Sequence, residues 1–156
     1  MRFWFIILVL FAAFLVTFRF EKIPVLILSK EGKVVYTKKL EDGKFILTFV
    51  HSVEKTPVYE FYEILGDDTL YLYKTRYSSM GAGLPFQAEG RFETKNGFFE
   101  AEISRRFKEI SLRVSPLDGH GLLFKDDKVM FKDIANSNDL LVLSCKHSIN
   151  VDFRFK

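Results

Sequence analysis

The chain is poor in the residues that build disulfides and metal clusters. It contains one cysteine, Cys145, and three histidines among 156 residues. A single cysteine excludes an intrachain disulfide and a thiolate metal cluster. Because Cys145 ends the largely apolar run that begins at Leu140, we expect a buried, inert thiol. Neither a Gly-x-x-x-x-Gly-Lys-Ser/Thr nor a Gly-x-Ser-x-Gly motif occurs, so the sequence assigns no catalytic residue and no cofactor.

Glutamine and an excess of one charge are also scarce. Gln87 is the only glutamine, and depletion of thermolabile residues hints at a thermophilic source. The chain has 23 Lys and Arg against 20 Asp and Glu. Arg2 and Arg19 flank an apolar segment, and without them residues 20–156 carry 21 − 20 = +1. A nearly neutral domain without runs of like charge argues against a nucleic-acid partner.

An uncharged segment of 16 residues, Phe3–Phe18, lies near the N-terminus. A helix of that length spans about 24 Å, slightly less than the ~30 Å hydrocarbon core of a bilayer. A retained signal anchor is the favoured interpretation, and a cleaved secretory signal or a buried core helix are the alternatives. We therefore expect an N-terminal apolar helix in a membrane anchor over residues 1–22. The protein would cross the cell membrane once, and residues 23–156 would form its extracytoplasmic domain.

Period-two alternation of apolar residues dominates the rest of the chain. Phe45, Leu47 and Phe49 alternate with their neighbours, and turn signals such as Asn96-Gly97 separate such runs. Asn-Gly favours a tight hairpin turn with positive φ. The pattern predicts an all-β fold, an antiparallel sandwich or barrel of about ten to twelve short strands. The only helical piece expected after the N-terminal segment is 132–138.

One candidate site lies around the connection from His51 to Pro57, between two convincing strands. His51 is in phase with Phe49, and Glu60 is in phase with apolar residues of the next strand. We therefore expect both side chains to point inward as close neighbours, where a carboxylate must be paired or hydrogen-bonded. Three interpretations stay open: a hydrogen bond that pins the hairpin, a ligand-binding group, or a metal site with His120 as a third ligand.

A second candidate site is the run Ser78–Pro85, whose glycines Gly81 and Gly83 precede Pro85. Glycine permits positive φ and a close approach of the backbone. Consecutive free amides in such a turn can bind an anion, including a carboxylate. A tight connection that is shaped only by packing is the alternative.

Together these features resemble the domain of unknown function 1850 family over roughly residues 24–156. The residues that carry the resemblance are His51, Ser52, Val53, Glu54, Thr56, Pro57, Glu60, Gly81, Ala82, Gly83, Leu84, Pro85, Leu112, Arg113, Val114 and His120. The resemblance implies a small protein with an N-terminal apolar segment, encoded beside TAXI-type TRAP transporters. These are secondary transporters that are served by an extracytoplasmic solute-binding protein. It implies no catalytic residue.

The expected function is therefore an accessory or binding component of such a transport system. His51, Ser52, Glu54, Glu60, Gly81, Gly83, Pro85 and His120 would form its partner- or ligand-binding surface. The expected partners are the membrane, through residues 3–18, and the transporter subunits or the solute-binding protein. A small metal-binding or hydrolytic envelope enzyme that uses His51, Glu60 and His120 is one alternative. A purely structural envelope protein is the other.

Overall fold

The computed structural model describes residue 4, residues 18–79 and residues 90–153 of the chain. Apart from Trp4 and Phe18, the apolar segment predicted over residues 3–18 lies outside these ranges. Within them, no helix has the length and apolar character needed to cross a membrane.

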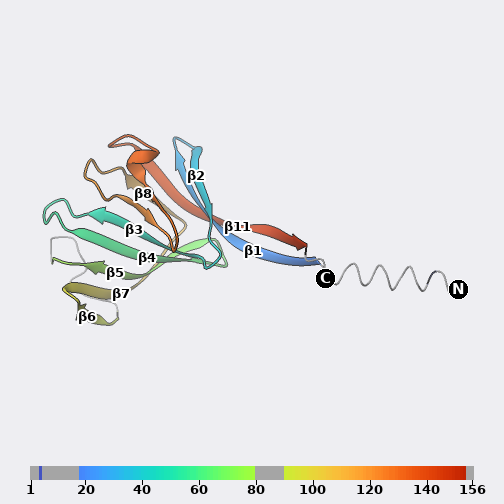
Figure 1. The fold of residues 1–156 in the computed structure, drawn as a ribbon, viewed down its shortest axis with the longest axis horizontal. Helices are drawn as coiled ribbons and strands as arrows, with labels where there is room; N and C mark the ends of the chain where they lie inside the picture. Colours follow the sequence, from blue (N-terminus) through green and yellow to red (C-terminus); the bar gives the residue numbers. More distant parts are fainter. Residues whose placement is uncertain (1–3, 5–17, 80–89, 154–156) are drawn as a thin grey trace.

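Two antiparallel β-sheets face each other (Figure 1). The strands are β1 (Phe18–Lys30), β2 (Lys33–Lys39), β3 (Lys44–Val50), β4 (Pro57–Leu65), β5 (Thr69–Tyr77), β6 (Phe92–Lys95), β7 (Phe98–Phe107), β8 (Glu109–Arg113), β9 (Gly121–Leu123), β10 (Lys128–Met130) and β11 (Leu140–Phe153). Sheet A has the order β2-β1-β11-β8, and sheet B has the order β10-β9-β3-β4-β5-β7-β6. The predicted all-β antiparallel fold is confirmed in the described residues, and the predicted N-terminal helix lies outside them.

The core lies between the sheets and is built from alternating apolar residues. Sheet A contributes Leu26 and Leu28 from β1 and Leu141 and Leu143 from β11, all four with no exposed surface. Sheet B contributes Phe45, Leu47, Tyr62, Ile64, Leu70, Leu72, Ile103 and Leu122 to the same cluster. Each fully buried apolar side chain of this size contributes about 1.5–3 kcal/mol. The alternation that predicted the strands therefore also builds the contact between the two sheets.

Turn residues mark the strand ends as the sequence indicates. Asn96 and Gly97 join β6 to β7 with φ of 52° and 77°, which confirms the predicted tight hairpin turn. Glu31 (φ 51°) and Gly32 (φ 74°) make the same kind of turn between β1 and β2. The helical piece expected at residues 132–138 is wrong in extent. Only a short 3-10 helix, η1 (Phe131–Asp133), occurs there. Its first residue, Phe131, is fully buried and anchors the segment to the core.

The two longest strands, β1 and β11, pair over their whole length, from Phe18 with Phe153 to Lys30 with Leu141. β2 pairs with β1 only from Val25 onward, and β8 pairs with β11 only up to Ser144. Residues 18–24 and 147–153 therefore form a two-stranded ribbon that extends beyond the sandwich (Figure 1). We call this ribbon the stem.

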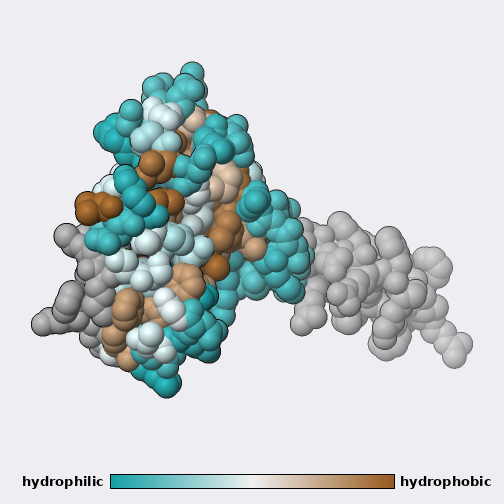
Figure 2. Space-filling view, turned by 60° about the vertical axis from the view of Figure 1, so that its left-hand side comes forward, coloured by the Kyte–Doolittle hydropathy of each residue, from teal (hydrophilic) through white to brown (hydrophobic). Residues whose placement is uncertain are grey.

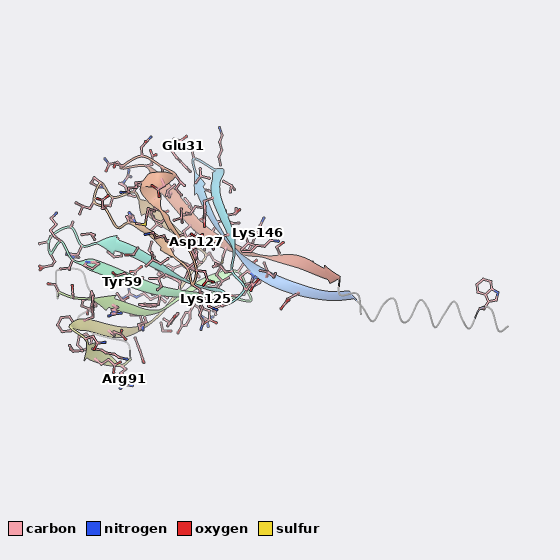
Figure 3. All side chains as sticks on the ribbon, in the orientation of Figure 1. Glu31, Tyr59, Arg91, Lys125, Asp127 and Lys146 are labelled. Atoms are coloured by element: carbon pink, nitrogen blue, oxygen red, sulfur yellow. The ribbon has the colours of Figure 1, made fainter. Side chains whose placement is uncertain are left out.

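The surface is a mixture of charged and apolar residues. Figure 2 shows hydrophilic and hydrophobic residues interspersed on one face of the molecule. Several charges are paired, as in the contact of Lys38 Nζ with Asp127 Oδ2 at 2.8 Å, which joins β2 to the turn between β9 and β10; Asp127 is labelled in Figure 3. Such exposed pairs contribute at most about 1 kcal/mol each. The fold therefore depends on the core rather than on surface charge.

Gly121 is a position at which the fold tolerates no side chain. A Cβ there would collide with the carbonyl oxygen of Val129 and lie 2.9 Å from Cα of Met130. We expect Gly121→Ala to lower the free energy of unfolding by about 1–3 kcal/mol, since overpacking forces the backbone to move.

Gly66→Ala is the matched control, because a Cβ at Gly66 meets no heavy atom within 4 Å. That variant should stay within about 0.5 kcal/mol of the wild type. Denaturant unfolding followed by far-UV circular dichroism measures both, and equal midpoints for the two variants would contradict the prediction.

Candidate functional site

Four strand ends meet at one end of sheet B. β3 finishes beside the start of β4, where Val50 pairs with Pro57. β5 finishes there too, because Tyr77 pairs with Val58. β9 begins at the same end, where Gly121 pairs with Thr48. We call this the motif end, because several residues that carry the family resemblance, among them His51–Glu54 and His120, follow or precede these strand ends.

A compact loop, His51–Thr56, joins β3 to β4 at the motif end. The N–H of His51 donates to the Thr56 carbonyl oxygen, and the N–H of Lys55 donates to the His51 carbonyl oxygen, both at 2.9 Å. Lys55 takes a positive φ of 56° to close the turn. Ser52, Val53, Glu54 and Lys55 are exposed, Val53 to 71%. The loop therefore presents an apolar side chain among polar ones on a fixed backbone.

Side chains connect this loop to the end of β5. The Ser79 hydroxyl donates to Oε2 of Glu54 at 2.8 Å. The N–H of Glu54 donates to Nδ1 of His51 at 3.2 Å, so a neutral His51 carries its ring proton on Nε2. Ser79 is the last described residue of this segment. Gly81, Gly83 and Pro85 lie outside the described residues. The structure thus brings His51, Ser52 and Glu54 to the start of the glycine-containing run.

His120 precedes β9 at the same end, but it is buried rather than presented to a ligand. Its ring packs edge-on against Phe131, with ring centres 4.7 Å apart, and lies near Phe49. Its Nδ1 accepts a hydrogen bond from the Ser115 N–H at 3.0 Å. Burial lowers the pKa of His120. These contacts favour a structural role, in which a neutral imidazole satisfies a backbone amide within an aromatic cluster.

The expected closeness of His51 and Glu60 is wrong. Glu60 pairs with Leu47 on β3, whereas His51 lies four residues farther along the chain and is hydrogen-bonded to Thr56. Four residues of strand span about 13 Å. The antiparallel register therefore separates two side chains that alternation alone placed on one face. Within the described part of the chain, no group of three or more His, Cys, Asp or Glu could hold a metal ion.

Glu60 itself lies on the inner face of sheet B, as predicted for an inward carboxylate with a partner. The Tyr62 hydroxyl donates to its Oε2 at 2.9 Å, and the ring of Tyr62 stacks on Phe45 with ring centres 5.1 Å apart. Burial raises the pKa of Glu60, while the Tyr62 hydrogen bond and the Arg105 guanidinium act to lower it. Arg105 reaches this region because Tyr62, Leu72 and Arg105 form one row across three strands.

At the base of the stem, a polar contact joins β11 of sheet A to the turn between β4 and β5 of sheet B. The N–H of His147 and its ring Nδ1 both contact Oδ1 of Asp68, at 2.9 and 2.6 Å. The His147 contact lowers the pKa of Asp68. Cys145 is half-buried on β11, and burial raises its thiol pKa to about 11, so the thiol stays protonated at neutral pH. Sequence reasoning missed Arg105 and Asp68, because register and turn geometry bring them to their partners.

Glu60 provides a prediction about pH. Its folded-state pKa is raised, so its contribution to stability is greatest below the ordinary carboxyl pKa and is lost as the pH rises through the raised value. We expect Glu60→Gln to increase the free energy of unfolding at pH 7 by about 1 kcal/mol, a typical size for a single substitution. The gain should vanish near pH 4, where the wild-type carboxyl is protonated.

Glu63→Gln is the control, because Glu63 lies on the opposite face of β4. Denaturant unfolding of both variants and the wild type between pH 4 and pH 8 checks this prediction. A gain at pH 7 that persists unchanged at pH 4, or a gain of equal size for Glu63→Gln, would contradict it.

Comparison with known proteins places the chain in one family. Residues 45–131 match the family model described as Domain of unknown function (DUF1850), and this range is more than half of the 156-residue chain. The match runs from Phe45 on β3 to Phe131 at the start of η1 and therefore includes the motif end. Among curated proteins none matches the chain, and none does among solved structures. The chain therefore belongs to the domain of unknown function 1850 family.

Proposed function

We propose that this protein is a membrane-anchored, extracytoplasmic accessory component of a TAXI-type TRAP transport system. In this proposal the motif end is the surface that binds another protein of that system. Membership of the family is the starting point, since the resemblance implies that such proteins are encoded beside these transporters. The single observation that carries the choice of surface is the exposed loop Ser52–Lys55, fixed by backbone hydrogen bonds and tied to Ser79.

The chemistry of the motif end supports a protein partner. Val53 is 71% exposed and is flanked by the polar side chains of Ser52 and Glu54, and protein interfaces commonly combine an apolar centre with a polar rim. The loop is preformed, so little conformational entropy would be lost on binding. Glu54 is held by Ser79 at 2.8 Å, which fixes one carboxylate oxygen in place.

A small solute fits this surface less well than a protein does. Ser52, Val53 and Glu54 form an exposed loop tip, whereas small-molecule sites are concave and bury most of the ligand. Two hollows, of about 340 and 540 Å³, lie elsewhere on the described surface. We therefore assign the motif end to the recognition of the solute-binding protein or of a membrane subunit.

The test is co-purification of the full-length protein with transporter components from native membranes. We expect the wild type to recover a transporter subunit or the solute-binding protein. Val53→Asp should reduce that recovery about tenfold or more, because a buried charge at the centre of an interface costs at least about 1.4 kcal/mol.

Val34→Asp is the matched control, since Val34 is also an exposed valine, at 60%, but lies on β2 of sheet A. It should behave like the wild type, and both variants should keep the wild-type melting temperature. Recovery of no transporter component by the wild type would sink the proposal, and so would equal recovery by the two variants. Either outcome would favour a purely structural envelope protein.

A further inference from the structure

A hollow of about 540 Å³ lies on the outer face of sheet B, away from the motif end. Its wall is formed by β5, β7 and the residues that lead into β6. The residues that line it and carry the argument are Tyr71, Tyr73, Lys74, Gly90, Glu102 and Ser104. Its volume falls within the range of roughly 300–1,000 Å³ that is usual for ligand pockets.

An irregularity in strand pairing lies at this hollow. Leu72 pairs with Arg105, but Lys74 pairs with Glu102, so the register between β5 and β7 shifts at Tyr73. The register between β4 and β5 shifts at the same residue. As a result the consecutive residues Tyr73 and Lys74 both lie on the outer face, where Lys74 pairs with Phe61 and Tyr73 contacts the Phe61 ring. β-Bulges commonly re-aim side chains next to functional sites.

The polar groups at the hollow are held in place by neighbouring residues. The Arg91 N–H donates to Oε2 of Glu102 at 3.1 Å. Gly90 lies so close that a Cβ there would be 2.8 Å from the same oxygen. The ammonium of Lys74 lies 3.3 Å from Glu100 and 4.3 Å from the centre of the Phe61 ring. Tyr71 donates to the Ser104 hydroxyl at 3.4 Å. The donors and acceptors are therefore preorganised.

The composition of the lining selects among ligands. Lys74 and Glu102 carry opposite charges, so an anion would meet Glu102 and a cation would meet Lys74. A wholly apolar ligand would displace the water that completes the hydrogen bonding of Lys74 and Glu102 and would offer no polar atom in its place, at about 1–3 kcal/mol each. The two phenol rings offer flat apolar surface with polar tips. A neutral ligand with many hydroxyl groups and an apolar C–H face satisfies all of these groups.

We propose that this hollow is a carbohydrate-binding site for a neutral sugar or short oligosaccharide. The sugar ring packs on Tyr71 and Tyr73, while Lys74 donates to its hydroxyl oxygens and Glu102 accepts from its hydroxyl groups. The proposal does not depend on the transporter association, because it uses a different surface and different residues.

The test is isothermal titration calorimetry of the full-length protein in phosphatidylcholine nanodiscs. Maltoside and glucoside detergents are avoided, because their sugar head groups would compete. Triacetylchitotriose and maltotriose are the neutral probes, and glutamate and spermidine are the charged ones. We expect saturable binding of at least one neutral probe and none of either charged probe. Hydrogen exchange should slow at residues 71–74 and 102–104 when that sugar is bound.

Tyr73→Ala should weaken sugar binding about fivefold to tenfold. Tyr59→Ala is the matched control, because Tyr59 is a half-buried tyrosine of the same outer face that does not line the hollow, and Figure 3 shows it on β4. It should bind like the wild type. Three results would overturn the proposal: no binding of either sugar up to its solubility limit, binding of only a charged probe, or equal weakening by the two substitutions. The exchange measurement on the wild type decides the question even if Tyr73→Ala does not fold.

Discussion

The pairing of β1 with β11 is the constraint on which the rest of the structure depends. These strands come from opposite ends of the described chain, and they form the centre of sheet A. Among the described strands, β2 pairs only with β1 and β8 pairs only with β11, so the strand pairing of sheet A would separate into two parts without the β1–β11 contact. Its leucines Leu28 and Leu143 face each other in this register and are fully buried. The apolar face of sheet B is covered only while those leucines are held together.

Most of the side chains that could bind a partner or a ligand lie where the regular strand pairing is interrupted. The motif end is a set of strand ends closed by a loop with a positive φ at Lys55. The hollow on the outer face lies beside the shift in register at Tyr73. Glu60 is the exception, because it lies within a regular strand and is held inside by Tyr62. Burial raises the pKa of that carboxyl group, whereas the Tyr62 hydrogen bond and the Arg105 guanidinium act to lower it.

Features that depend on neighbours in sequence were predictable, and contacts that depend on strand pairing were not. Alternation of Phe45 and Leu47 identified a strand and its buried face, and Asn96-Gly97 identified a turn, because both signals depend only on neighbours in sequence. The inward direction of Glu60 followed from the same rule. Its distance from His51 did not, since one face of two strands contains many positions and only pairing selects between them. The contact of Asp68 with His147 joins positions 79 residues apart, and no local pattern encodes it.

The stem gives the domain a direction of mechanical strength. A pull that enters through the N-terminal residues reaches β1 at Phe18 and acts along the axis of that strand. Thirteen residue pairs join β1 to β11, and their hydrogen bonds lie perpendicular to the strands. They would therefore be sheared together and would share the force. A sideways pull between residues 18 and 153 would instead open the ribbon one pair at a time from its tip, so the same contacts resist strongly along the strand and weakly across it.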